Sequence, residues 1–433
     1  MPLDIVVGSQ WGDEGKGRIT DLLAAEADIV ARYNGGDNAG HSVSVGGQLF
    51  RLHLIPSGIV QPRSICLLGN GMVVNPSTLV QEIDQLASLG VNISPIRIKL
   101  SSAAHVITPA HLALDGAEEA SRGGAQIGTT RRGIGPAYSD KVARRGIRAG
   151  AMRDPESFSR AVEEQVRRAG LLLERLYGMP APDAASARQA YGEYAERLRP
   201  YLADTGAIVA DALSDGKTVL AEGAQGTLLD LDHGTYPFVT SSYPTASGAL
   251  LGLGVGPRHV RRIIGVAKAF QTRVGAGAFP TEVFAETAER LRGTGENPWD
   301  EFGTTTGRPR RCGWLDAVLL RFAARVNGLT ELALTKLDIL TSLHPLKLCV
   351  AYRCGSSLHR DLPDGPADLS AFSPAFDELP GWEDDLSSAR RWEQLPSNAQ
   401  GYVSSIERLV GIPVRLISVG PERNQIVIRE GPM

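Results

Sequence analysis

The residues best suited to chemistry lie in a glycine-rich segment near the N-terminus, residues 8–17, which reads GSQWGDEGKG. The segment follows an apolar run at 3–7 that predicts a strand, and a helix is expected from 18 to about 26. Glycines let backbone amides approach an anion closely, and a helix N-terminus adds a favourable dipole. Lys16 is surrounded by three of them, Gly12, Gly15 and Gly17. The segment is therefore predicted to hold phosphate groups, and the alternative is a surface turn.

This segment differs from an ordinary P-loop at two positions. A P-loop has a glycine five residues before its Gly-Lys pair and a hydroxyl directly after it, whereas this chain has Gln10 and Gly17 there. A carboxylate, Asp13, lies inside the loop instead. An acid beside phosphates is repulsive unless a metal ion or a proton transfer makes use of it. We therefore predict that Asp13 is a magnesium ligand, a general base, or both.

A second glycine-rich loop, NGGDNAGHS at 34–42, follows a predicted strand at 29–33. Loops at the carboxyl ends of strands are where α/β sheets place ligands. His41 can donate or accept a proton near neutral pH, or donate a hydrogen bond to a phosphate oxygen. The alternative is an exposed loop histidine. A hairpin is expected at 43–54, turning at Gly46-Gly47.

Two further segments concentrate positive charge. Residues 121–150 are basic and glycine-rich and contain Thr129 and Thr130; hydroxyls beside guanidinium groups suit a phosphate monoester. The segment GTTTGRPRR at 303–311 brings three arginines together behind small hydroxyls, which suits a substrate with two carboxylates. For the first of these segments, the alternative is a solvated basic loop.

A predicted strand at 332–335 ends in Lys336-Leu337-Asp338, and the resulting TKLD resembles the guanine-reading motif of GTPases. A carboxylate can accept from both the ring N–H and the exocyclic amine of guanine, whereas adenine offers no such pair of donors. Charge-assisted hydrogen bonds contribute about 1.5–3 kcal/mol each, so one aspartate would favour GTP over ATP by roughly tenfold or more. Four residues alone also fit an ordinary turn at the end of a strand.

Composition argues against several classes of function. The chain has 433 residues, 42% of them hydrophobic, and its 49 glycines are far above the usual frequency. A formal net charge of -3 gives no global field that selects nucleic acid or membrane, so neither is predicted as a partner. We find no signal peptide and no apolar stretch long enough to cross a bilayer. The four cysteines lack zinc-like spacing and are interpreted as reduced thiols of a cytoplasmic protein.

Strands and helices alternate along the chain, which predicts an α/β fold with a large, mainly parallel central sheet flanked by helices. The phosphate loop makes this fold P-loop-NTPase-like, with a variant loop. Residues 151–215 show helical spacing and are expected to form two or three helices, a helical insertion or cap within one domain that spans 1–433. Residues 272–281 are expected to be a loop, and residues 355–385 to be peripheral.

Several of these segments resemble signatures of one family. QWGDEGKG at 10–17 and GIGPAYSDKVARRG at 133–146 resemble two signatures of adenylosuccinate synthetases. Similar blocks at 222–242, 272–282 and 335–338 extend the resemblance over essentially the whole chain. It implies a ligase of purine biosynthesis that joins inosine monophosphate (IMP) to L-aspartate at the expense of GTP, with Mg²⁺. It also implies a homodimer in which Arg144 reaches the neighbouring active site.

The resemblance also implies roles for individual residues. The implied catalytic residues are Asp13, His41 and Lys16, and the implied metal ligands are Asp13 and Gly40. The implied IMP-binding residues are Asp13, Asn38, Thr130, Arg144, Gln225, Thr240 and Arg308. The implied GTP-binding residues are Gly12, Glu14, Gly15, Lys16, Gly17, Gly40, Ser42, Arg310, Lys336, Asp338, Ser418 and Gly420. The implied aspartate-binding residues are Val274, Thr305, Thr306, Arg308 and Arg310. Pro309 departs from the family's usual pattern and removes one backbone donor from its loop.

Replacing the 6-oxygen of a purine by an amine needs a better leaving group than oxide, which explains why a triphosphate is consumed. The hypothesis is that Asp13 takes the ring N–H proton of IMP while the 6-oxygen attacks the γ-phosphate, giving a 6-phosphoryl intermediate. The amine of aspartate then displaces phosphate. Asp232 and His233 could be mistaken for a catalytic pair, and a structural role is preferred for them. The alternatives are a P-loop-type GTPase or nucleotide kinase without aspartate, and an inactive nucleotide-binding scaffold.

Overall fold

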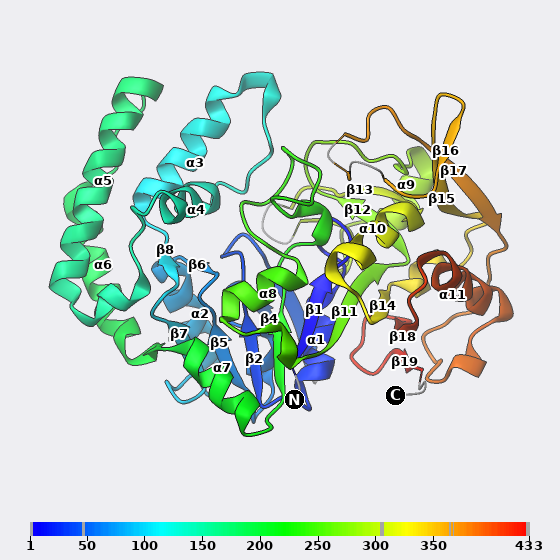
Figure 1. Ribbon diagram of the computed structural model, residues 1–433, viewed down its shortest axis with the longest axis horizontal. Helices are drawn as coiled ribbons and strands as arrows, with labels where there is room; N and C mark the ends of the chain where they lie inside the picture. Colours follow the sequence, from blue (N-terminus) through cyan, green and yellow to red (C-terminus); the bar gives the residue numbers. More distant parts are fainter. Residues whose placement is uncertain (1–2, 46–47, 304–306, 363–364, 367, 430–433) are drawn as a thin grey trace.

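Short apolar strands separated by helices assemble into a ten-stranded central sheet (Figure 1). The computed structural model describes residues 3–45, 48–303, 307–362, 365–366 and 368–429. In their order across the sheet, the strands are β19 (Ile426–Ile428), β18 (Val414–Ser418), β14 (Glu331–Thr335), β11 (Val260–Lys268), β1 (Leu3–Gly8), β10 (Val219–Glu222), β2 (Ile29–Arg32), β5 (Ile65–Leu68), β7 (Ile98–Ser101) and β9 (Leu202–Ala203). Neighbouring strands run parallel except β18 and β19. The predicted large, mainly parallel sheet is confirmed.

Helices cover both faces of this sheet. Successive side chains of a strand point to opposite faces. Along β1, Ile5 belongs to the core cluster that includes Val209 of α7, whereas Val6 belongs to the cluster that includes Ile19 of α1. The helices are α1 (Lys16–Ala24), α2 (Pro76–Ser88), α3 (Pro109–Ser121), α4 (Ile134–Val142), α5 (Pro155–Tyr177), α6 (Ala184–Leu198), α7 (Thr205–Ser214), α8 (Ala246–Leu253), α9 (Ala285–Arg292), α10 (Ala317–Asn327) and α11 (Ser397–Val410). The α/β fold class is therefore confirmed. Among the described residues, no helix is long and apolar enough to cross a membrane.

A second, smaller sheet lies beside the central one, at the upper right in Figure 1. Its strands are β12 (Phe270–Arg273), β13 (Arg311–Asp316), β15 (Leu346–Cys354), β16 (Ser357–His359) and β17 (Ser373–Leu379). One expectation was wrong in part: Thr272 and Arg273 belong to β12, whereas 274–281 lie outside any strand. The segment 355–385, expected to be peripheral, contributes two partly exposed strands to this sheet. β17 was not predicted, because a proline argues against a strand. Pro374 is tolerated here because β17 pairs with β15 on one side only.

The remaining strands form two short pairs. β3 (His41–Val45) and β4 (Gln48–Leu52) make the hairpin predicted from the sequence, and its expected turn at Gly46-Gly47 lies outside the described residues. β6 (Val73–Val74) pairs in parallel with β8 (His105–Val106). The hairpin matters for function because it begins at His41.

Residues 151–215 form three helices, α5, α6 and α7, as the helical spacing predicted. The pair α5 and α6 stands at the left in Figure 1, and the fully buried Phe158, Val162 and Val166 form its inner face. The segment also joins the main sheet, because β9 pairs with β7 and Val209 of α7 lies in the central core. The assignment of 1–433 to one domain stays a prediction.

The basic segment at 121–150 is more ordered than a loop. It contains α4, which begins after Gly133 in the left-handed region at φ 73°, a conformation that favours glycine. A Cβ at Gly133 would also lie 2.9 Å from the backbone of His111. Its glycines had suggested a loop, yet one of them serves as the cap of a helix.

The buried histidine of β8 makes stability depend on pH. Burial, followed by the charges of Lys141, Arg148 and His111, lowers the pKa of His105 to about 4. The folded protein therefore keeps His105 neutral, whereas the unfolded chain protonates it below its ordinary pKa of about 6.5. Because the unfolded state binds the extra proton, the free energy of unfolding falls as the pH drops from 6.5 towards 4.

We expect His105→Gln to lose less stability than the wild type between pH 7 and pH 5. Urea unfolding at the two pH values measures this difference. His233→Gln, a substitution at an exposed histidine, serves as the control and should follow the wild type. Parallel pH dependence in the wild type and His105→Gln would contradict the assignment.

Candidate active site

The phosphate loop is built around a buried carboxylate. β1 ends at Gly8, and α1 begins at Lys16, two residues earlier than predicted. Between them, Glu14 is fully buried and accepts the backbone N–H groups of Gln10 and Gly12, both at 3.0 Å. Its other oxygen lies 2.5 Å from Lys16 Nζ. Glu14 therefore fixes the path of the loop and positions its cation.

His41 lies directly above the first turn of α1. A Cβ placed on Gly17 would lie 2.8 Å from Cδ2 of the imidazole ring, so only glycine fits there. Nε2 of His41 lies 2.9 Å from Ser57 Oγ, which donates its proton to Glu222 at 3.0 Å. Since Ser57 has one proton to give, it accepts from His41, and the neutral ring carries its hydrogen on Nε2.

Burial, followed by the charges of Arg32, His53 and Lys16, lowers the pKa of His41 to about 3. The ring is therefore neutral at pH 7 in this geometry and acts as a hydrogen-bond donor. Glu222, whose own pKa is raised by burial, lies 3.4 Å from Nε2. Ser57 and Glu222 were missed from the sequence, although Glu222 begins one of the family-like blocks.

The structure brings the predicted base next to a predicted substrate arginine. Oδ2 of Asp13 lies 2.9 Å from Nε of Arg310, and the same guanidinium reaches Glu301 at 2.6 Å. Burial acts to lower the pKa of Arg310, but Asp13 and Glu301 raise it. The predicted Lys336 also contacts Glu301, as does the buried Lys268. Glu301 and Lys268 were missed, because neither belongs to a motif that points to a ligand.

The predicted guanine-reading residues converge at the ends of β14 and β18. Thr335 Oγ1 donates to the Glu14 carbonyl at 2.6 Å, which ties the TKLD turn to the phosphate loop. Arg18 of α1 donates to Ser418 Oγ at 2.7 Å and to the Gly420 carbonyl, and it interacts electrostatically with Asp338. Burial lowers the pKa of Arg18 to about 10 and raises that of Asp338. Arg18 is a link between the two guanine loops that the sequence did not reveal.

A separate network holds the predicted purine residues. Asn34 joins the loop after β2 to the loop after β10. Its side chain donates to the Ala224 carbonyl at 3.2 Å and accepts from the Ala224 N–H at 3.0 Å. It also contacts Oε1 of Gln225 at 3.4 Å. Thr240 Oγ1 lies 3.2 Å from Ser242 Oγ, and Asn38 accepts from the Gly36 N–H at 3.2 Å.

The remaining predicted residues lie around this centre. Thr130 lies in the segment before α4, and Arg144 follows that helix with an exposed side chain. Val274 comes directly after β12 and is 40% exposed, so it can face a ligand. Thr305 and Thr306 lie outside the described residues. Gly40 lies in the loop directly before β3, and Ser42 is the second residue of β3.

The arginine loop is closed by backbone hydrogen bonds that avoid Pro309. The Gly303 N–H donates to the Arg308 carbonyl at 2.8 Å, and the Arg310 N–H donates to the Glu301 carbonyl at 2.9 Å. The donor that proline lacks is therefore not needed to close the loop. Asp232 and His233 are exposed, and their backbone N–H groups donate to the side chain of Asp230.

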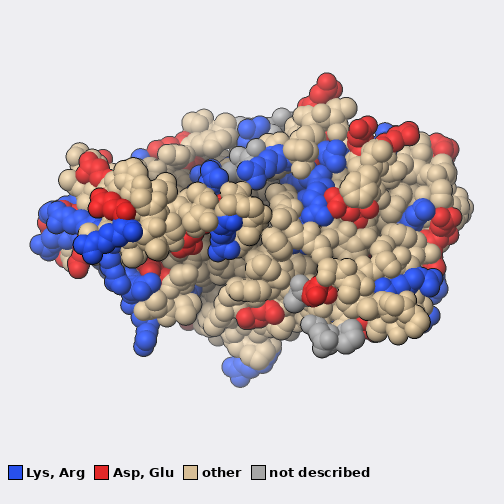
Figure 2. All heavy atoms as spheres, turned by 90° about the horizontal axis from the view of Figure 1, so that it is seen from above, with Lys and Arg blue, Asp and Glu red and all other residues tan. Residues whose placement is uncertain are grey.

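The donor set suits Mg²⁺ bound together with phosphates. Across the described part of the chain, no group of three or more His, Cys, Asp or Glu side chains could hold a metal ion. Magnesium that is bound with substrate phosphates needs only one or two protein oxygens, and Asp13 and the Gly40 carbonyl are oxygen donors. Lys and Arg gather near the middle of the face at the carboxyl ends of the strands (Figure 2). The face therefore favours anions.

Comparisons with known proteins bear on the family of the chain. The family model described as adenylosuccinate synthetase matches residues 5–427. Adenylosuccinate synthetases of Moorella thermoacetica and Carboxydothermus hydrogenoformans are 54% and 51% identical to this chain, over 100% and 99% of both chains. A solved structure of fully ligated adenylosuccinate synthetase from Plasmodium falciparum has a TM-score of 0.93 and 37% identity, over 99% of this chain and 100% of that chain. The chain therefore belongs to the adenylosuccinate synthetase family.

Proposed function

We infer that the chain catalyses the reaction of its family, the GTP-dependent ligation of L-aspartate to IMP, which yields adenylosuccinate, GDP and phosphate. The observation that carries this inference is a contact between Asp13, in the phosphate loop, and Arg310, in the arginine loop. Oδ2 of the first lies 2.9 Å from Nε of the second. It places a proton acceptor beside a cation suited to a carboxylate substrate. A GTPase or nucleotide kinase would account for the phosphate loop and TKLD but leaves the arginine loop without a purpose, so this alternative is not favoured.

In the first step, Asp13 takes the N1 proton of IMP and the 6-oxygen attacks the γ-phosphate of GTP. Lys16 and the loop amides stabilise the charge of the transferring group. His41 donates its one N–H to this group once the Nε2 hydrogen turns away from Ser57 Oγ, its partner before substrate binds. Lys16 is paired with Glu14, so it is positioned by that carboxylate before it meets a phosphate. Mg²⁺, held by Asp13 and Gly40 together with the phosphates, would neutralise further negative charge.

In the second step, the α-amine of aspartate attacks C6 and phosphate leaves. Arg308 and Arg310 bind the carboxylates of aspartate, beside Val274 and with Thr305 and Thr306 as further donors. Arg310 can exchange its contact with Asp13 for a contact with an incoming carboxylate, which links substrate binding to the release of Asp13 for proton removal.

The other assignments of the proposal follow the placement of the loops. Asn38, Thr130, Gln225 and Thr240 bind IMP, with Arg308 also reaching it. The nucleotide binds across the phosphate loop and the two guanine loops described above. The enzyme is proposed to be a cytoplasmic homodimer, and the exposed Arg144 suits a residue that reaches into a neighbouring active site.

The test of this function is the change in purine absorbance with IMP, GTP, Mg²⁺ and L-aspartate, each omitted in turn. We expect a spectral change that requires all four components, because the 6-oxygen is replaced only when transfer and ligation both occur. GTP hydrolysis that proceeds without any need for aspartate would instead support the GTPase alternative.

Asp13→Asn removes the base but keeps the size of the side chain. We expect kcat to fall by about 10²–10⁴-fold, the usual contribution of general acid–base catalysis, while GTP binding survives. Steady-state kinetics together with calorimetric titration of GDP separate the two effects. Turnover near that of the wild type would contradict the role of Asp13 as the base.

Asp338→Asn weakens the contact that distinguishes guanine from adenine. We expect the ratio of kcat/KM for GTP to that for ATP to fall by roughly tenfold or more, since charge-assisted hydrogen bonds are replaced by neutral ones. Asp361→Asn is the control, because this carboxylate is exposed and pairs with Arg321 away from the site. An unchanged ratio in Asp338→Asn would rule out this reading of TKLD.

A further inference from the structure

Glu301 is a buried carboxylate that is surrounded by three cations. It is 1% exposed, and its side chain meets Lys268 at 2.7 Å, Arg310 at 2.6 Å and the ammonium group of Lys336. Its backbone is fixed as well, since its N–H donates to the Arg292 carbonyl at 2.7 Å and its carbonyl accepts from Arg310. Glu301 is therefore held at the base of the arginine loop from both its backbone and its side chain.

The three cations come from different parts of the fold. Lys268 ends β11, Lys336 follows β14 in the TKLD turn, and Arg310 precedes β13. β11 and β14 are neighbours in the central sheet, and Lys268 lies opposite Thr335 in their register. Without an anion between them, cations at adjacent strand ends would repel one another. Glu301 is the group that allows them to share this place.

The electrostatics favour an ionised Glu301. Burial opposes ionisation, but Lys268, Lys336 and Arg310 together hold the pKa of Glu301 well below its usual range. Arg310 continues the chain of contacts to Asp13. The three cations face the carboxylates of Glu301 and Asp13, so the cluster keeps one net positive charge with which to meet an anionic substrate.

We propose that Glu301 is a positioning residue that joins Lys336 of the GTP site to Arg310 of the aspartate site, so that both sites depend on one carboxylate. The inference rests on the proposed function and adds a specific consequence to it. A change at Glu301 acts on GTP and aspartate together. IMP is affected less, because most of the residues assigned to it lie outside the arginine loop, and Asn34 holds two of its loops through separate hydrogen bonds.

Glu301→Gln alone would leave three cations close together in the interior, and such a protein is at risk of misfolding. The combination Glu301→Gln with Lys268→Met removes one carboxylate and one cation, so the net charge of the cluster is unchanged. Lys268 is fully buried and contacts Thr272 and Glu301 only through its ammonium group. The double variant therefore tests the link between Lys336 and Arg310 without a change in the net charge of the buried cluster.

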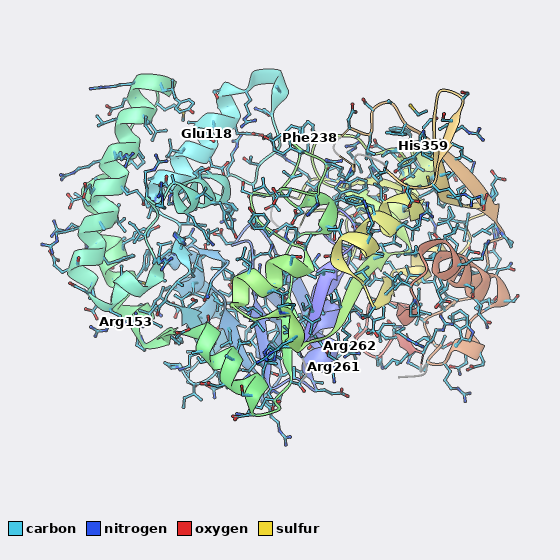
Figure 3. The ribbon with its side chains drawn as sticks, in the orientation of Figure 1. Glu118, Arg153, Phe238, Arg261, Arg262 and His359 are labelled. Carbon is cyan, nitrogen blue, oxygen red and sulfur yellow. The ribbon has the colours of Figure 1, made fainter. Side chains whose placement is uncertain are left out.

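Asp4→Asn is the matched control. Asp4 is also buried, at 2% exposed, and it binds Arg261 at 2.6 Å and Arg262 at 2.9 Å. These arginines lie at the lower end of the central sheet in Figure 3, whereas Phe238, from the segment that carries Gln225, lies at the upper end. The control thus breaks a similar cluster far from the substrates.

In steady-state assays of ligation, we expect the double variant to raise the apparent KM for both GTP and aspartate by roughly tenfold or more, the size expected when a charged hydrogen bond is lost. The KM for IMP should stay near that of the wild type, and Glu301→Asp should give intermediate values. Asp4→Asn should lower the melting temperature without a change in any KM.

A folded double variant with unchanged KM values for GTP and aspartate would overturn the inference, and so would a rise in only one of them. Circular dichroism establishes that each variant is folded. The wild type is assayed first: a wild type that forms no adenylosuccinate refutes the proposed function, whereas an active wild type beside an unaffected double variant refutes the role of Glu301 alone.

Discussion

Burying positive charge at one end of a sheet is the constraint on which the rest of this structure depends. A site for phosphates and carboxylates needs cations, yet a buried cation without a partner is costly. In three places the fold meets this constraint with a buried carboxylate: Glu14 beside Lys16, Glu301 beside Arg310, and Glu222 beside Arg32. These carboxylates hold the cations in place before any substrate arrives, so the site is formed in advance.

The parallel sheet makes this arrangement possible, because the carboxyl ends of its strands lie side by side. Segments far apart in the sequence are then joined by single side chains. Thr335 ties the TKLD turn to the phosphate loop, Asn34 joins two purine loops, and Arg18 bridges to the loop after β18. Thr335 is the last residue of β14 and Asn34 lies two residues after β2, whereas Arg18 reaches out from α1 with a long side chain.

The sequence predicted the parts of the protein that depend on local patterns. Alternating strands and helices, the phosphate loop and the helices of 151–215 follow from spacing and composition. The second sheet was not foreseen, because β17 contains Pro374 and becomes recognisable only through its pairing with β15. Glu301, Glu222 and Arg18 were missed for the same reason. Most of their partners are remote in the sequence, and no local pattern indicates what each residue contacts.

The packing of Gly17 against His41 bears on how such a phosphate loop can arise. In an ordinary P-loop a hydroxyl side chain occupies the position of Gly17, but here the imidazole ring fills that space and would lie 2.8 Å from an added Cβ. The hydroxyl and the histidine therefore exclude each other. An evolutionary path between the two kinds of loop has to exchange both residues, and a chain that acquired only one of them would hold either a clash or a gap beside its phosphates.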